Sequence, residues 1–433
     1  MPTTASPSTA PFSTPAAQHA PHTTQRESWR QRSLMKLAAL KAATPVTPLL
    51  ELSLRGLGEA RILIKDERAH ASGSLKHRLA MSLFEQALLK DWLTPGGPVI
   101  EASSGSTAVS EAWLARRLGL EFIAVVPRGT AFYKQQAIRG EGGRVVEIED
   151  PARLCQHAQA LADDSGGHFI NQFRHAATAG DWRSDGAGDW ASDTSLPGEC
   201  LAQIAARELP ELQAVFLGAG TGGSAASFAR HLRHKRHLHQ GSYLHHGSHR
   251  TRVIGVDPEH SVYHACWQHH RAHGTRTTAL PVPQATNPIE GIGRPCVLEA
   301  FDPAHFDDYR RIADARSQAA ALWLAEHAGL EVGPSTGTAF AGLLESLALR
   351  RARGESLAGS WLLLACDHAE RYATSLGDPA WRAAQQSRLA PQRAWIEAFA
   401  ERNDDALYDT PPETTTPRRV AGCRKAHPMR RRG

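Results

Sequence analysis

The sequence predicts an α/β fold in which mostly parallel strands are covered by helices on both faces. Three observations support this fold class. Short apolar runs alternate with amphipathic helical stretches along most of the chain, as expected for buried parallel strands connected by helices. Loops rich in glycine or hydroxyl residues follow two of these runs, at 102–107 and 218–224, and open doubly wound sheets bind ligands at that edge. With 433 residues and 41% apolar content, the chain is long enough for two coupled domains.

Each element is predicted from the spacing of its apolar residues, which is continuous in buried strands and recurs every three or four positions in helices. In chain order the pattern predicts a strand at 61–67, a helix at 77–93, a strand at 97–103, a helix at 106–119, a strand at 121–127, a helix at 133–143 and a strand at 144–149. Further strands are predicted at 214–220, 252–258 and 361–367.

Three segments lie outside this pattern. Residues 1–35 are rich in Ser, Thr, Pro and Ala, which predicts a disordered leader, with a transit peptide as the alternative. Residues 231–250 contain seven histidines. No carboxylate or cysteine accompanies them to fix a metal geometry, so we predict a solvated insertion and no metal site. Residues 391–433 are interpreted as a C-terminal extension that ends in a basic tail.

The net charge indicates which classes of binding partner to expect, and the cysteines indicate the cellular compartment. The formal charge of +5 falls to −2 without the seven Lys and Arg residues of 417–433. Because the folded part is then close to neutral, we expect no nucleic-acid partner. No run of about 18 apolar residues is present, so no membrane span is expected. The six cysteines are scattered and form no C-x-x-C pair, which favours the reducing cytoplasm.

The most informative loop is the stretch "FLGAGTGGS" at 216–224. Gly218, Gly220 and Gly223 match G-x-G-x-x-G between a predicted strand and a helix, a loop whose backbone amides bind phosphate. A dinucleotide site is one interpretation. That interpretation expects an early βαβ unit and an acidic residue about 20 positions on, whereas this loop lies mid-chain before an Arg- and His-rich stretch. A single phosphate therefore fits better, and a tight turn without a ligand is the remaining alternative.

A second feature is Lys76, which stands where the small residues of "ASGSL" give way to a helical pattern. A surface lysine is the simplest alternative. A lysine at such a junction, combined with a separate phosphate loop, instead indicates pyridoxal 5'-phosphate with Lys76 as the Schiff-base lysine. The hydroxyl-rich loop at 103–107 then supplies N–H and O–H donors for a substrate carboxylate, although Ser104 or Ser106 also fits an ordinary helix N-cap.

These motifs together resemble a known family, the fold-type II pyridoxal-phosphate enzymes of the cysteine synthase and cystathionine β-synthase branch. The resemblance runs from about residue 45 to 380, and within that branch the sequence most resembles the bacterial cysteine desulfhydrases. It rests on seven motifs in the family's order: "SGSLKHR", "EASSGSTAVSEAWLA", "INQF", "GAGTGGS", "IEGIGRP", "GPSTGTAF" and "CDHAERY". It implies a tryptophan synthase β-like fold for residues 36–390, a smaller mobile domain at about 78–185, a larger domain formed by the rest, and a homodimer.

The resemblance also implies roles for individual residues. Lys76 would carry the cofactor and move the proton, and Ser335 would face the pyridine nitrogen. The phosphate would be bound by Gly220, Thr221, Gly222, Gly223 and Ser224. The substrate carboxylate would be bound by Ser103, Ser104, Thr107 and Gln172, and the loop around Gly291 would line the mouth of the site. Two positions depart from the common family pattern: Ser106 replaces an Asn that contacts the cofactor's ring oxygen, and His77 replaces an Asp.

The predicted activity is β-elimination on L-cysteine, which gives hydrogen sulfide, pyruvate and ammonia. A hydroxyl at the pyridine nitrogen stabilises a charged ring less than a carboxylate would, which favours loss of a β-substituent over transamination. The alternatives are cysteine synthase, which combines O-acetylserine with sulfide, and a cystathionine β-synthase-like enzyme. A nicotinamide-dependent dehydrogenase is the alternative from a different class, and an inactive binding protein is opposed by the intact Lys76.

Overall fold

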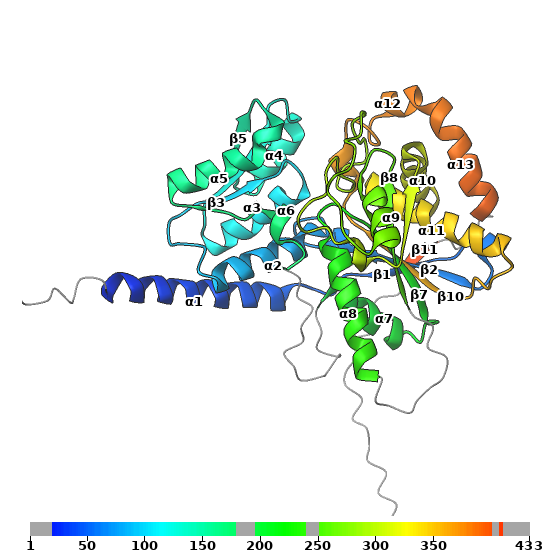
Figure 1. Cartoon of the computed structure of the whole chain (residues 1–433), viewed down its shortest axis with the longest axis horizontal. Helices are drawn as coiled ribbons and strands as arrows, with labels where there is room; N and C mark the ends of the chain where they lie inside the picture. The colour runs from blue at the N-terminus through cyan, green and yellow to red at the C-terminus, as the bar shows by residue number, and fades with distance from the viewer. Residues whose placement is uncertain (1–19, 179–194, 240–250, 401–406, 410–433) are drawn as a thin grey trace, which may run out of the picture.

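The computed structural model describes residues 20–178, 195–239, 251–400 and 407–409, which form two β-sheets with their covering helices (Figure 1). The larger sheet has the order β11-β1-β2-β10-β7-β8-β9. Its strands are β1 (Leu49–Leu52), β2 (Ala60–Asp66), β7 (Leu212–Gly218), β8 (Arg252–Pro258), β9 (Asp308–Ile312), β10 (Gly359–Ala365) and β11 (Leu407–Asp409). The smaller sheet has the order β5-β4-β3-β6, with β3 (Val99–Ala102), β4 (Phe122–Pro127), β5 (Arg144–Ile148) and β6 (His168–Phe169).

The predicted α/β class is confirmed, with one addition at the edge of the larger sheet. All strand pairs are parallel except those of β1, which runs antiparallel to both β2 and β11. The helices are α1 (Ala20–Ala43), α2 (Lys76–Leu89), α3 (Ser106–Leu118), α4 (Phe132–Gly140), α5 (Leu154–Ser165), α6 (Gln172–His175), α7 (Leu196–Ala206), α8 (Gly223–His239), α9 (Tyr263–His273), α10 (Asp314–Ala328), α11 (Pro334–Ala352), α12 (Pro379–Ala384) and α13 (Gln386–Ala400).

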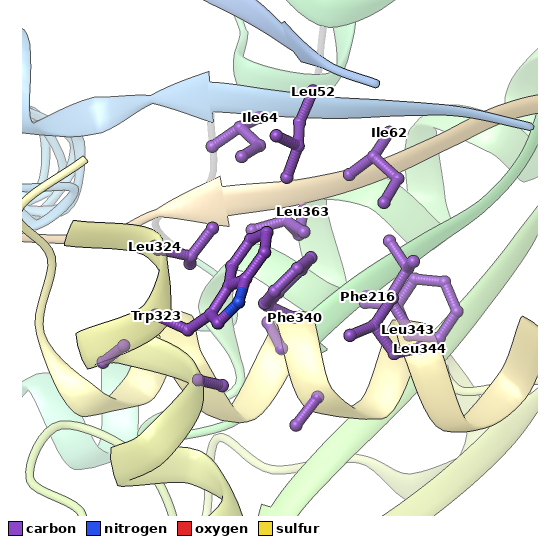
Figure 2. Packing of buried hydrophobic residues seen from close by; sticks show 14 of the residues in the cluster. Leu52, Ile62, Ile64, Phe216, Trp323, Leu324, Phe340, Leu343, Leu344 and Leu363 are labelled. Atoms are coloured by element: carbon purple, nitrogen blue, oxygen red, sulfur yellow. The ribbon is translucent and has the colours of Figure 1, made fainter. Parts of the chain in front are cut away.

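The larger sheet is buried on both faces, and β10 shows why its sequence is continuously apolar. Trp361 and Leu363 point into a core shared with α10, α11 and α13, whereas Leu362 and Leu364 point into a core shared with α7, α8 and α9. Successive side chains of β10 point to opposite faces of the sheet, and both faces are covered by helices, so both sets of side chains are apolar. Figure 2 shows the first of these cores, where Trp323 and Phe340 lie between the helices and the strands.

The smaller sheet is covered on one face by α2 and α3 and on the other by α5. α1 packs on the α2 side, and this overturns the prediction of a disordered leader for residues 20–35. An apolar stripe that includes Trp29, Leu34, Leu37 and Leu40 holds α1 in place, with Leu37 fully buried. Burial of this stripe offsets the entropy cost of ordering the helix. In Figure 1, α1 extends beneath the smaller sheet as a long blue helix.

Two other predicted segments differ from the structure. Residues 231–239 of the predicted loop at 231–250 form the last turns of α8, and His231 is buried at 1% exposure; residues 240–250 lie outside the described part. Within the C-terminal extension, α13 packs against α10, and β11 pairs with β1, while the basic tail lies outside the described residues. None of the described helices is long and apolar enough to cross a membrane. The mobility of the smaller domain stays a prediction.

Candidate active site

Lys76 is the first residue of α2 and lies at the carboxyl end of β10. The Leu75 amide donates to the Cys366 carbonyl oxygen at 2.8 Å, and Ser74 forms an antiparallel bridge with Asp367. These contacts hold the start of α2 against the segment that follows β10. Burial raises the pKa of the Cys366 thiol to about 12, and the nearby Lys76 ammonium opposes that rise. The Lys76 amine therefore lies among the groups at the sheet's carboxyl edge.

Ser335 reaches the same place from the start of α11. It is the second residue of that helix, is 5% exposed, and lies near the Cys366 thiol, whose pKa it lowers slightly against the effect of burial. Thr336 accepts a hydrogen bond from the Cys366 amide at 3.1 Å. The residue expected to face a pyridine nitrogen is thus brought next to the segment that contacts Lys76.

The glycine-rich loop at 218–224 follows β7, the neighbour of β10 in the sheet. A side chain at Gly220 would place its Cβ 2.2 Å from the Gly291 carbonyl oxygen, and Gly222 has a φ of 88°. Both positions therefore require glycine. The Ala226 amide donates to the Gly222 carbonyl oxygen at 3.0 Å, so the earlier amides of α8 have no helical acceptor and are free to bind an anion. Thr221 is buried at 6% exposure, and Ser224 is half-buried.

The predicted mouth loop lies against this glycine loop. The Gly293 amide donates to the Ala219 carbonyl oxygen at 2.8 Å, and Gly291 is exposed with a φ of 88°. The structure thus brings Gly291 beside Gly220, and its place at the mouth of the site stays a prediction.

The hydroxyl-rich loop at 103–107 leads from β3 into α3. The N-cap of α3 is Gly105, and no side chain caps the helix, so the alternative in which Ser104 or Ser106 forms an ordinary N-cap is wrong. The uncapped first-turn amides are therefore donors for a carboxylate. Ser103 and Ser104 are half-buried, and the Ser103 hydroxyl accepts from the Gly105 amide at 3.3 Å.

Thr107 and Gln172 are held together behind this loop. The Thr107 hydroxyl donates to the Gln172 side-chain oxygen at 2.7 Å, and the Gln172 amide donates to Glu101 at 3.0 Å. Glu101 also accepts from the Ala102 amide at 2.8 Å. Burial raises the pKa of Glu101 to about 7. Glu101 therefore fixes the start of α6 relative to β3, which in turn orients Gln172 toward Thr107.

Asp367 connects these parts, although the sequence assigned no role to it. Its Oδ2 atom accepts from the Tyr372 hydroxyl at 2.9 Å and from the Ser106 hydroxyl at 3.4 Å. Its Oδ1 atom is buried and has no hydrogen-bond partner among the described residues. Burial raises the pKa of Asp367, while Arg371, the Tyr372 hydrogen bond and Lys76 oppose that rise. A carboxylate thus lies between Lys76 and the loop that carries Ser106.

A chain of alternating positive and negative side chains connects α2 to β2 and α7. We call it the charge chain, and its members are Lys65, Glu199, Arg78, Glu67 and His70. Lys65 contacts Glu199 at 2.9 Å, Glu199 contacts Arg78 at 2.7 Å, and Arg78 contacts Glu67 at 2.6 Å. His70 contacts Glu67 at 3.0 Å. Burial raises the pKa of Glu67, but Arg78 and His70 outweigh burial and hold it well below its usual range. This charge chain fixes β2 and α7 to the helix that begins with Lys76.

His77, where the resemblance leads us to expect Asp, is a buried side chain at 2% exposure. Its ring stacks on His70 at 4.8 Å and contacts the edge of Trp113 at 4.7 Å, and its Nδ1 atom lies 3.1 Å from the Ser72 hydroxyl. Burial lowers the pKa of His77 to about 3. The His77 side chain is therefore a neutral packing group.

These residues fit pyridoxal phosphate. The glycine loop, the open amides at the start of α8 and the buried Thr221 suit a phosphate group. Lys76 and Ser335 lie at the carboxyl end of β10, the strand next to β7. There the Lys76 amine suits the cofactor's aldehyde, and the Ser335 hydroxyl suits its ring nitrogen.

Comparisons with known proteins agree with this fit. Residues 39–367 match the family model of pyridoxal-phosphate dependent enzymes. The chain is 35% identical over 362 residues to an L-cysteine desulfhydrase of Mycobacterium tuberculosis, in an alignment that covers 83% of this chain and 90% of the relative. It is 28% identical to a putative cysteine synthase of Sinorhizobium fredii, covering 84% and 95% of the two chains.

Solved structures show the same fold. A hydrogen sulfide-producing enzyme of Fusobacterium nucleatum matches with a TM-score of 0.63 at 20% identity, covering 83% of this chain and 96% of that chain. An O-ureido-L-serine synthase matches with a TM-score of 0.62 at 21% identity, covering 83% and 98%.

Proposed function

Since the chain belongs to the pyridoxal-phosphate dependent enzymes, we propose that it catalyses β-elimination on L-cysteine to give hydrogen sulfide, pyruvate and ammonia. Membership in this family supports pyridoxal phosphate, rather than a dinucleotide, as the ligand that we propose for the loop at 218–224. The observation that carries the choice of reaction is the 35% identity to an L-cysteine desulfhydrase along 90% of that relative.

In this proposal the site residues divide into three groups. The cofactor phosphate is bound by Gly220, Thr221, Gly222, Gly223 and Ser224, with Ser335 at the ring nitrogen and Ser106 near the ring oxygen. The substrate carboxylate is bound at the uncapped start of α3 by Ser103, Ser104 and Thr107, with Gln172 behind them and Gly291 at the mouth. No metal ion takes part.

The bound cofactor withdraws electrons from the substrate's Cα, which acidifies the Cα–H bond and lets the β-sulfur leave. Lys76 moves the proton, because its amine lies at the carboxyl end of β10, near Cys366 and Asp367, where the cofactor would be bound. The Cα proton passes to Nζ, the C–S bond breaks, and the sulfur leaves with a proton as hydrogen sulfide. Water then replaces the nitrogen, which gives pyruvate and ammonia.

The Ser106–Asp367 contact supports elimination over replacement. In the family the equivalent Asn is expected to contact the cofactor's ring oxygen, whereas here the Ser106 hydroxyl points its hydrogen to Asp367 at 3.4 Å. The loop at 103–107 is then less tied to the cofactor, so water reaches the site before a second nucleophile arrives.

The test is to incubate the purified protein with L-cysteine and to measure sulfide and pyruvate separately. We expect equal amounts of the two products, and none from Lys76→Ala. In a parallel assay with O-acetylserine and sulfide, the rate of cysteine formation is compared with the rate of cysteine loss. Faster formation than loss would replace this proposal with cysteine synthase, which the 28% identical relative favours.

The proposal also includes a cytoplasmic homodimer with L-cysteine as the small-molecule substrate. The cysteines of the described residues, Cys155, Cys200, Cys266, Cys296 and Cys366, are all unpaired, which favours a reducing compartment. Light scattering of the purified protein tests the dimer, which rests on the family resemblance alone.

A further inference from the structure

Arg294 is a half-buried arginine whose guanidinium lies against the glycine loop. It follows the mouth loop in "IEGIGRP", and a Cβ built on Gly220 would lie 3.6 Å from its Nη2 atom. Its backbone is fixed on both sides, because the Arg294 amide donates to the Ser261 hydroxyl at 3.1 Å and its carbonyl accepts from Val262 at 3.0 Å. The guanidinium is therefore held at the glycine loop by its own segment.

The guanidinium has almost no partners for its donors. A guanidinium offers five N–H groups. Within the described part of the chain, the one side-chain hydrogen bond of Arg294 is from Nη1 to the Gly293 carbonyl oxygen at 3.5 Å, which is long. Its Nε atom is buried without a partner, and no carboxylate of the described residues lies within 4.0 Å of it. A buried donor without a partner is costly, so the Nε atom of this half-buried cation favours a negatively charged group beside it.

The segments around Arg294 are the same ones that enclose the glycine loop. The Arg294 guanidinium lies 5.8 Å from the ring of Phe173, whose carbonyl oxygen accepts from the Ala300 amide at 3.1 Å. A Cβ at Gly222 would lie 3.1 Å from the Ala300 carbonyl oxygen, and one at Gly223 would lie 2.9 Å from that of Ala176. Arg294 and the open amides of α8 therefore belong to segments that pack around the same glycine loop.

We propose that Arg294 is a ligand of the cofactor's phosphate group, adding a full positive charge to the backbone amides of the loop at 220–224. A phosphate dianion is the anion that both features suit, since arginine binds phosphate oxygens through paired N–H donors. The inference is independent of which reaction the enzyme catalyses, because it concerns only the phosphate.

The experiment compares two probes on the cofactor-free protein: pyridoxal 5'-phosphate, and pyridoxal, which lacks the phosphate. Dissociation constants are measured by tryptophan fluorescence for wild type, Arg294→Met and Arg294→Lys. Arg310→Met is the matched control, because Arg310 is a partly buried arginine of β9 that pairs with Asp308.

We expect Arg294→Met to weaken pyridoxal phosphate binding by roughly 10- to 100-fold, the usual effect of losing charge-assisted hydrogen bonds, and to leave pyridoxal binding unchanged. Arg294→Lys should recover part of the loss, and the control should bind both probes as wild type does. Phosphorus NMR of the bound cofactor should also show that the phosphate takes up a proton at higher pH in Arg294→Met than in wild type.

Three results would overturn the inference. An equal loss for both probes would assign Arg294 a structural role, and unchanged affinities would remove it from the phosphate. A higher KM for cysteine with an unchanged ratio of the two dissociation constants would place the guanidinium at the substrate. If Arg294→Met does not fold, Arg294→Lys decides, since it keeps the charge but loses the paired donors and should lower the affinity for pyridoxal phosphate alone.

Discussion

Replacing Tyr372 by Phe should destabilise the protein through Asp367. The Tyr372 hydroxyl donates to Asp367 Oδ2 at 2.9 Å. Among the described residues, Ser106 at 3.4 Å is the one other donor to that atom, and Oδ1 has no partner. Removing the short bond leaves a 7% exposed carboxylate with one long hydrogen bond. Hydrogen bonds to charged groups contribute about 1.5–3 kcal/mol, so a loss in that range is expected.

The matched control is Tyr309→Phe. Tyr309 is 2% exposed, and its hydroxyl is buried without a hydrogen-bond partner among the described residues. Removing an unsatisfied polar atom should leave the free energy of unfolding unchanged or raise it by up to about 1 kcal/mol. The two variants remove the same atom from similarly buried rings, so the difference between them isolates the hydrogen bond.

The assay is urea unfolding at a fixed, saturating cofactor concentration, because a ligand that binds the folded state shifts the midpoint. Asp367→Asn and the double variant with Tyr372→Phe complete a double-mutant cycle, for which contacting residues give coupling energies of about 0.5–3 kcal/mol. Equal destabilisation by Tyr372→Phe and Tyr309→Phe, or a coupling energy of zero, would refute the reasoning.

Three further predictions concern the site and the helix that begins with Lys76. Lys76→Ala should abolish the cofactor's visible absorption band and sulfide release, whereas Lys90→Ala should keep both; a borohydride-stable cofactor adduct in Lys76→Ala would contradict this assignment. Ser106→Asn should lower pyruvate formation from cysteine and raise replacement by an added thiol, by up to about tenfold, and an unaltered ratio would count against a role for Ser106. Because burial lowers the pKa of His77 from 6.5 to about 3, the unfolded chain binds a proton below pH 6.5 that the folded chain does not, so stability falls as the pH drops through this range. His77→Phe should reduce that fall by up to about 1.4 kcal/mol per pH unit, and unfolding curves with the same acid dependence in both proteins would disprove it.

The sequence predicted the strands in the middle of the larger sheet. β10 and β7 are mostly apolar runs, and both were placed correctly to within two residues. Of the described strands, β1, β6, β9 and β11 were missed. β9, with the sequence DYRRI, is an edge strand whose charged residues break the apolar pattern. α1 was missed because the Ser- and Thr-rich composition before it masked a stripe of apolar residues, and that stripe becomes stable only by packing on α2 and α3.

In the candidate site, too, some residues could be predicted from the sequence and others could not. Lys76 and the glycine loop were predicted because a short motif carries their chemistry. Asp367 and Arg294 lie in motifs that were recognised, "CDHAERY" and "IEGIGRP", but no role followed from their position in the chain. The role of Asp367 follows from its contact with Ser106, which is 261 positions away in the chain. The proposed role of Arg294 follows from its contact with a glycine loop about 70 positions earlier. Such pairings appear only when the chain is folded.

The charge chain that joins β2, α2 and α7 limits which substitutions this sequence can accept during evolution. Lys65 and Glu67 are fully buried, and Glu199 and Arg78 join them through bonds of 2.6–2.9 Å. Removing one member strands an opposite charge, at a cost of about 3–5 kcal/mol, whereas replacing a whole buried pair is often neutral. Most single substitutions here would therefore be eliminated by selection, and lineages are expected to change these positions jointly. Among descendants of a common ancestor, residues 65, 67, 78 and 199 should covary, although they come from β2, the turn after it, α2 and α7.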